Sequence, residues 1–120
     1  MQAYGMALDL RDDPTLIARY KKEHANVWPE VAARLREIGV TEMKIFLLGR
    51  RLFMYCETRE GFDPAKDFPR SNDDPTYRKW DELMRTMQER VDDAKPGEWW
   101  AMMELVFDLN WSKHSAARSA

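Results

Sequence analysis

Cysteine and long apolar runs are scarce in this chain. Its 120 residues include a single cysteine, Cys56, so no disulfide can form within the chain. No apolar stretch approaches the roughly 20 residues that a membrane-spanning helix needs. The N-terminal sequence MQAYGMALDL also lacks the basic start and the apolar run of a signal peptide. These absences predict a protein of the cytoplasm with no membrane segment.

Neither sign of charge dominates the composition. Nineteen Lys and Arg residues nearly balance 21 Asp and Glu residues, which gives a formal net charge of -2. Without a broad positive field, a protein gains little electrostatic binding energy from the phosphates of nucleic acids or from anionic lipids. We therefore expect a neutral small molecule as the ligand, and neither a nucleic acid nor a membrane as a partner.

Signatures of metal and cofactor sites are missing too. The chain has two histidines, His24 and His114, and His114 falls in a polar tail. One cysteine, one usable histidine and scattered carboxylates do not make a ligand spacing. Glycine-rich phosphate loops, nucleophile elbows and dinucleotide fingerprints are absent. No metal is predicted, and cofactor-borne chemistry has no support in the sequence.

What the chain does contain is a succession of strand and helix patterns. Residues 2–10 alternate large apolar side chains with small or polar ones, which predicts a strand. A helix is expected to start after Asp13, a good N-cap, and to run to about residue 27. Pro29 predicts a break there, because proline disfavours helical geometry in the preceding residue. The helical pattern resumes over residues 30–39.

The second half of the chain repeats the succession of strands and helix. Residues 41–49 and 51–59 predict an antiparallel hairpin. The proline-interrupted stretch 60–75 indicates a loop or short helix, and 76–93 carries the apolar stripe of a second major helix. Residues 99–109 alternate apolar and mixed positions, which predicts a fourth strand.

The order strand, helix, strand, strand, helix, strand is typical of an α+β, ferredoxin-like split β-α-β sandwich with both helices on one face. The first and fourth predicted strands carry large apolar side chains on both faces, so the uncovered face is expected to pack on a second copy as a dimeric α+β barrel. We expect one domain over residues 1–111, with 112–120 as a disordered tail.

The stretch YKKEHANVWPE is unusual for a charged helix, because it sets Tyr20 and His24 one turn apart. Packing is one interpretation, since amphipathic rings bury carbon and leave a polar tip wet. Chemistry is the other, since an imidazole near pKa 6.5 suits proton transfer at neutral pH. Five tryptophans leave a similar choice open: Trp99 and Trp100 either fill interfaces or stack on a ligand.

Four segments carry a family resemblance: YKKEHANVWPEVAARLREIGV, IFLLGRRLFMYCE, RKWDELM and ELVFDL. Over roughly residues 4–110 the chain resembles the L-rhamnose mutarotase family, and the run Y-x-x-x-H-x-x-x-W-P-E is the most specific part of the likeness. The resemblance implies a cofactor-free, cytoplasmic homodimer that interconverts the α and β anomers of a 6-deoxy-L-hexose. It further implies that His24 is the acid-base residue and that Tyr20 and Trp80 contact the sugar.

Two positions depart from the rhamnose-type pattern. Met43 replaces a substrate-contacting tyrosine, and Lys79 replaces the first of two adjacent tryptophans. These departures make L-fucose the alternative sugar to L-rhamnose. A second proton-transfer group is not identified by the sequence, and Glu30 and Glu104 are the two carboxylates considered.

Two other functions fit the same architecture. Small dimeric monooxygenases, including haem-degrading ones, also place histidine, asparagine and tryptophan between helix and sheet, and fold alone does not separate them. A non-catalytic dimer that binds a sugar or another metabolite is the second alternative.

Overall fold

The computed structural model describes residues 1–111, so the predicted tail 112–120 and His114 lie outside the described residues. The strands and helices are β1 (Gln2–Leu10), α1 (Pro14–Ala25), α2 (Pro29–Ile38), β2 (Val40–Leu48), β3 (Arg51–Thr58), α3 (Pro64–Asp67), α4 (Pro75–Arg85), β4 (Gln88–Glu89) and β5 (Ala101–Met102). Short 3-10 helices cover Phe68–Asp73 and Leu109–Trp111. Within residues 1–111, no helix has the length and apolarity to span a bilayer.

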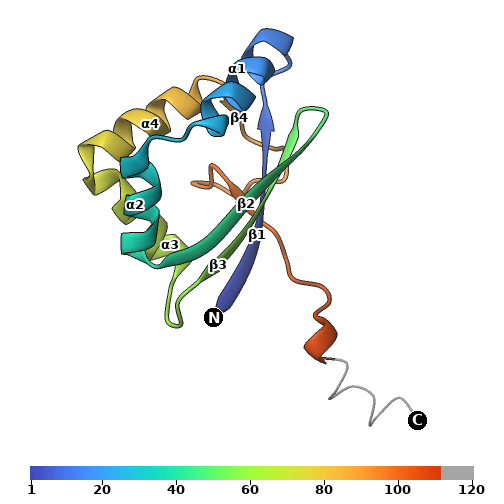
Figure 1. Ribbon diagram of the computed structural model, residues 1–120. Coiled ribbons are helices and arrows are strands. Elements are labelled where there is room, and N and C mark those ends of the chain that lie inside the picture. The colour runs from blue at the N-terminus through green and yellow to red at the C-terminus, as the bar shows by residue number, and fades with distance from the viewer. Residues whose placement is uncertain (112–120) are drawn as a thin grey trace.

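The strands form one antiparallel sheet in the order β2-β3-β1-β4, and β5 also pairs with β1. The long helices α1, α2 and α4 lie on one side of this curled sheet (Figure 1). The core fills the space between the two layers, where Leu8, Leu10 and Leu52 of the sheet meet Val31 and Met84 of the helices. This arrangement confirms the predicted α+β, ferredoxin-like fold.

The break between α1 and α2 falls where proline chemistry predicts it. The Asp13 carboxylate accepts a hydrogen bond from the Thr15 amide at 2.8 Å and caps α1. α2 restarts at Pro29, the first helical position, where a missing N–H costs nothing. Gly39 ends α2 with φ at 115°, a left-handed conformation that other residues adopt poorly. The hairpin of β2 and β3 is likewise confirmed.

The predicted helix 76–93 is wrong beyond Arg85, where α4 ends. The next residues turn toward the edge of β1: the Arg11 amide donates to the Met87 carbonyl at 3.0 Å, and Gln88 pairs with Leu10. The Met87 side chain is fully buried. Burial and pairing at an open sheet edge thus override the local helix propensity of this stretch.

The predicted fourth strand 99–109 is also mostly wrong, because only Ala101–Met102 pairs with β1. The last backbone bond to β1 runs from the Met103 amide to the Gly5 carbonyl, at 2.9 Å. Residues 103–108, which we call the arm, form neither helix nor strand and run away from the sheet (Figure 1). Alternation over 99–109 predicts a strand, but beyond Met103 the arm pairs with no strand among residues 1–111.

Candidate active site

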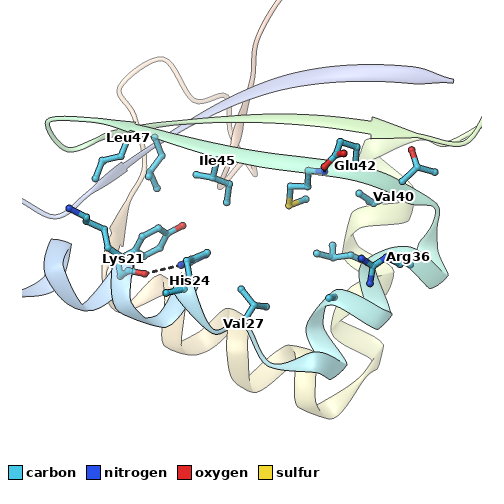
Figure 2. A pocket seen from close by; sticks show the side chains of 15 residues that line it. Lys21, His24, Val27, Arg36, Val40, Glu42, Ile45 and Leu47 are labelled. Carbon is cyan, nitrogen blue, oxygen red and sulfur yellow. Dashed lines mark hydrogen bonds between the residues drawn. The ribbon is translucent and has the colours of Figure 1, made fainter.

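A cavity of about 630 Å³ opens between the helices α1 and α2 and the strand β2 (Figure 2). It lies within the ~300–1,000 Å³ of typical small-molecule sites. Tyr20 and His24 line it from α1, and Met43 and Ile45 line it from β2. The stretch that stood out in the sequence therefore contributes the polar rings of an otherwise largely apolar cavity.

His24 is held in one tautomer by the backbone of its own helix. Its Nδ1 lies 3.0 Å from the carbonyl oxygen of Tyr20 (dashed in Figure 2). A carbonyl oxygen can only accept, so Nδ1 carries the hydrogen and donates. The neutral ring then keeps the lone pair on Nε2, which is the atom able to take a proton.

Burial keeps this imidazole neutral. Desolvation of the half-buried ring lowers the pKa of His24 below its usual 6.5, against smaller opposing effects of the Tyr20 carbonyl and the nearby Glu23 charge. His24 is therefore an unprotonated base at neutral pH, with Nδ1–H as its donor and Nε2 as its acceptor.

Tyr20 packs directly on His24. The two ring centroids lie 4.1 Å apart with the planes tilted by 31°. Only 4% of Tyr20 is exposed, and this burial raises the pKa of its phenol to about 12, although a hydrogen bond from Gln88 opposes the shift. The phenol is consequently protonated at physiological pH and can donate a hydrogen bond into the cavity.

Trp80 lies behind His24 rather than on the cavity wall. Its ring meets the His24 ring edge-on at 5.3 Å and the Trp28 ring at 5.2 Å. Trp80 is 6% exposed, and it is not among the described residues that line the cavity. In this chain Trp80 supports the imidazole, and its contact with a sugar stays a prediction.

The other positions singled out in the sequence divide between cavity and surface. Met43 lines the cavity, whereas Lys79 is exposed on α4. Glu30 is exposed in the first turn of α2, and Glu104 is exposed on the arm. Neither of these two carboxylates lines the cavity. The sequence-based candidates for a second proton-transfer group are therefore outside the cavity wall that carries His24.

Three charged residues of the cavity were missed by the sequence patterns: Lys21, Arg36 and Glu42. Strict alternation would turn the consecutive residues Glu42 and Met43 to opposite faces of β2. The register shift of β2 falls between Val40 and Glu42, ahead of this pair, so the alternation of Glu42 and Met43 is kept. Both residues nevertheless border the cavity, Met43 as a half-buried side chain and Glu42 as an exposed one. Over residues 1–111, no group of three or more His, Cys, Asp and Glu side chains could hold a metal ion.

Together, the fold and the site define a small ferredoxin-like protein with one neutral histidine at a cavity whose wall is mostly apolar. The sequence profile of the L-rhamnose mutarotase family matches residues 3–109. The chain therefore belongs to the L-rhamnose mutarotase family. Membership places it among isomerase-type enzymes that act on sugars, and it does not favour the monooxygenase alternative.

Individual relatives support the same placement. A UPF0734 protein of Dictyostelium discoideum is 49% identical over 116 residues, with 93% of each chain covered. The L-fucose mutarotase of Xanthomonas campestris is 39% identical over 112 residues, which cover 92% of this chain and 90% of the relative. The L-rhamnose mutarotase of Acidiphilium cryptum is 27% identical, over 76% of this chain and 86% of the relative.

Solved structures confirm the fold. The L-rhamnose mutarotase of Formosa agariphila superposes with a TM-score of 0.66 at 21% identity, covering 91% of this chain and 99% of that one. The tetracenomycin F2 cyclase of Streptomyces glaucescens gives 0.60 at 13% identity, over 90% and 96% of the two chains. These identities are low, so the two structures speak for the fold alone.

Proposed function

We propose that the protein is a cofactor-free mutarotase that interconverts the α and β anomers of a 6-deoxy-L-hexose, with L-fucose preferred over L-rhamnose. One observation carries the proposal: the neutral His24, locked with Nδ1–H toward the Tyr20 carbonyl, lines the cavity with a free lone pair on Nε2. Anomer exchange involves proton transfers and one bond rotation, with no redox step, so an imidazole is sufficient chemistry.

Ring opening needs one proton removed from the anomeric hydroxyl and one proton added to the ring oxygen. In our proposal, Nε2 of His24 accepts the proton of the anomeric hydroxyl, and the imidazolium then protonates the ring oxygen. The bond from the ring oxygen to the anomeric carbon breaks, and the open aldehyde forms. After rotation about the adjacent carbon–carbon bond, the same steps in reverse close the ring on the other face of the carbonyl.

One imidazole can serve both oxygens, because they are bonded to the same carbon. General acid-base catalysis of this kind contributes about 10² to 10⁴ in rate. Tyr20 is proposed to hold the sugar by donating its phenolic hydrogen to a sugar oxygen. Glu42 is the carboxylate of the cavity wall, and it replaces Glu30 and Glu104 as the residue to examine for a second proton transfer.

Two observations support L-fucose over L-rhamnose. The chain is more similar to an L-fucose mutarotase, at 39% identity, than to four L-rhamnose mutarotases, at 27–33%. Met43 also lines the cavity where the rhamnose-type pattern has a tyrosine, so one phenol is lost from the wall. A pocket that lacks one hydrogen-bonding group is expected to recognise a different hydroxyl arrangement.

The test is a panel of anomer-exchange rates measured by saturation-transfer NMR with L-fucose, L-rhamnose and common hexoses. We expect acceleration with both 6-deoxy sugars, fastest with L-fucose, and no effect of a metal chelator. Equal, uncatalysed rates for every sugar would exclude mutarotase activity and favour a binding protein. Faster exchange with L-rhamnose than with L-fucose would overturn the sugar assignment.

The protein is further proposed to act as a homodimer, and the face of the sheet opposite the helices supports this. Phe46 and Phe53 pair across β2 and β3 on that face, with ring centroids 6.2 Å apart. They are 56% and 37% exposed. Phe53 also lies across Gly5, where an added Cβ would come within 3.0 Å of its ring. Phe46 and Phe53 thus form an apolar surface, which we call the platform, and it is exposed to solvent in a single chain.

The arm provides the complementary surface on the same chain. Leu105, Val106 and Phe107 are 60%, 80% and 63% exposed. Residues 2–4 of β1, which precede Gly5, have no strand partner among the described residues on the edge that pairs with β4 and β5. In a two-fold dimer, the arm of each copy would cover the platform of the other copy. One contact would then bury both apolar surfaces.

The oligomeric state of two charge-introducing variants tests the homodimer. We expect the wild-type chain to sediment as a dimer, and Phe53→Glu on the platform and Phe107→Glu on the arm to sediment as monomers. Lys66→Glu, which adds a carboxylate at an exposed position on the helical side, is the matched control and should stay dimeric. A monomeric wild type, or a dimeric Phe53→Glu, would contradict the proposal.

The cytoplasm remains the proposed location. Cys56 is fully buried and free, and burial raises the pKa of its thiol to about 11. A thiol of this kind is unreactive, and a lone free cysteine is typical of a reducing compartment.

A further inference from the structure

A chain of hydrogen bonds reaches Tyr20 from outside the cavity. Nε1 of Trp99 donates to Oε1 of Gln88 at 2.8 Å. Nε2 of the same Gln88 amide donates to the hydroxyl oxygen of Tyr20, across a longer 3.4 Å. Neither Trp99 nor Gln88 lines the cavity among the described residues, yet the two are linked to a ring that does.

The direction of this chain is fixed by its first member. An indole nitrogen can only donate, so it selects the oxygen end of the Gln88 amide. The NH₂ end must then face Tyr20, because the reversed amide would set donor against donor at Trp99. The Tyr20 oxygen therefore receives a hydrogen bond from Gln88, and its own hydrogen is free to point elsewhere.

We propose that Gln88, oriented by Trp99, is a positioning residue that keeps the hydroxyl hydrogen of Tyr20 directed into the cavity as a donor to the ligand. That the ligand is a sugar rests on the function proposed above, whereas the orientation of the hydroxyl does not. In this view the Trp99 indole acts through the Gln88 amide. It neither serves packing alone nor stacks on the substrate.

The surroundings of Gln88 hold the amide in place. Its side chain is 3% exposed and its backbone pairs with Leu10 of β1. Nε of Arg11 donates to the backbone carbonyl oxygen of Gln88 at 3.2 Å. The Arg85 guanidinium lies 4.6 Å above the Trp99 ring and fixes the indole by a cation–π contact. The early end of α4 at Arg85 is what delivers Gln88 to this position, since a continued helix would carry it elsewhere.

A purely structural role for Gln88 is the rival explanation, and Gln88→Glu separates the two. The introduced carboxylate has nearly the same shape, but it can only accept, so the Tyr20 hydroxyl would donate to it and withdraw its hydrogen from the cavity. Gln88→Met keeps the size without any polarity and leaves the hydroxyl free to rotate. A positioning role predicts a larger loss for Gln88→Glu than for Gln88→Met.

The activity test measures kcat and KM for anomer exchange in these variants. We expect kcat/KM to fall on the order of tenfold or more in Gln88→Glu and severalfold in Gln88→Met, mostly through KM, because one ligand hydrogen bond is reversed or loosened. Trp99→Phe frees the amide to turn over and should resemble Gln88→Met. Trp100→Phe removes the neighbouring indole as a matched control and should equal the wild type.

Acidification supplies a readout that simple packing would not move. As the pH falls, the introduced carboxyl gains a proton and can again donate to Tyr20 while accepting from Trp99. The activity of Gln88→Glu relative to the wild type should therefore rise toward acid, with the position of the rise set by burial and by the nearby positive charges of Arg11 and Arg85. The ratio of Gln88→Met to the wild type should stay flat with pH.

A measurement without sugar separates failure of this proposal from failure of the proposed function. In protein carrying ¹³Cζ-tyrosine and ¹⁵N-tryptophan, Gln88→Glu should shift the Tyr20 Cζ and Trp99 Nε1 signals, assigned with Tyr20→Phe and Trp99→Phe. Shifted signals in a protein without exchange activity would leave the orientation of Tyr20 supported and the mutarotase function refuted. Unmoved signals, or wild-type kinetics in Gln88→Glu at every pH, would overturn the positioning role.

Discussion

Replacing Trp80 distinguishes support of His24 from contact with the sugar. The Trp80 ring is 6% exposed and packs edge-on against the rings of His24 and Trp28. Removing a buried ring of this size, as in Trp80→Ala, costs about 3–5 kcal/mol. For a domain of this length, that cost lowers the melting temperature by roughly 12–20 °C. Trp80→Phe keeps most of the packing and should cost about 1.5 kcal/mol or less.

The kinetics of Trp80→Phe give the decisive result. If the ring only steadies the imidazole, kcat falls on the order of tenfold, because small displacements of a catalytic group are expensive. KM should then change by less than about twofold, because a supporting ring adds no ground-state binding. Saturation-transfer NMR over a range of sugar concentrations measures both constants. An unchanged kcat with a KM raised about tenfold would refute the supporting role and place the ring on the sugar.

Two further predictions concern His24 and the sugar preference. Because the folded-state pKa of His24 lies below its unfolded 6.5, the unfolded chain binds more protons between these two values. Stability should therefore fall as the pH drops from 6.5 toward the folded-state pKa, and urea titrations should show a weaker pH slope in His24→Gln; a parallel slope would contradict this. The value of kcat/KM should hold down to the folded-state pKa and fall below it, where the base becomes protonated. Met43→Tyr with Lys79→Trp should shift the exchange preference toward L-rhamnose, mostly through Met43 because it lines the cavity, and NMR rates for both sugars should show it; an unchanged ratio of rates would refute the assignment.

Local rules predicted the elements whose ends depend on nearby residues. Asp13 caps α1, Pro29 separates it from α2, and Gly39 ends α2, as each residue's own conformational preference requires. The pairing of Tyr20 and His24 was predictable for the same reason, because helical spacing alone brings the two rings together.

Features set by distant contacts were not predictable from local patterns. The helical pattern beyond Arg85 is overridden at the open edge of β1, where Gln88 pairs with Leu10 and Met87 is buried. The strand pattern of 99–109 is realised only at Ala101–Met102, because the residues beyond Met103 pair with no strand in the described part of the chain. The tautomer of His24 follows from a hydrogen bond to a backbone carbonyl, which residue type does not reveal.

The most direct test of the account is the anomer-exchange rate of L-fucose at neutral pH with the wild type and with His24→Gln, compared by saturation-transfer NMR. With circular dichroism unchanged, the wild type should exceed the variant by about 10² to 10⁴ in rate, the range of a general acid-base group. Equal acceleration by both proteins would contradict the assignment of proton transfer to His24.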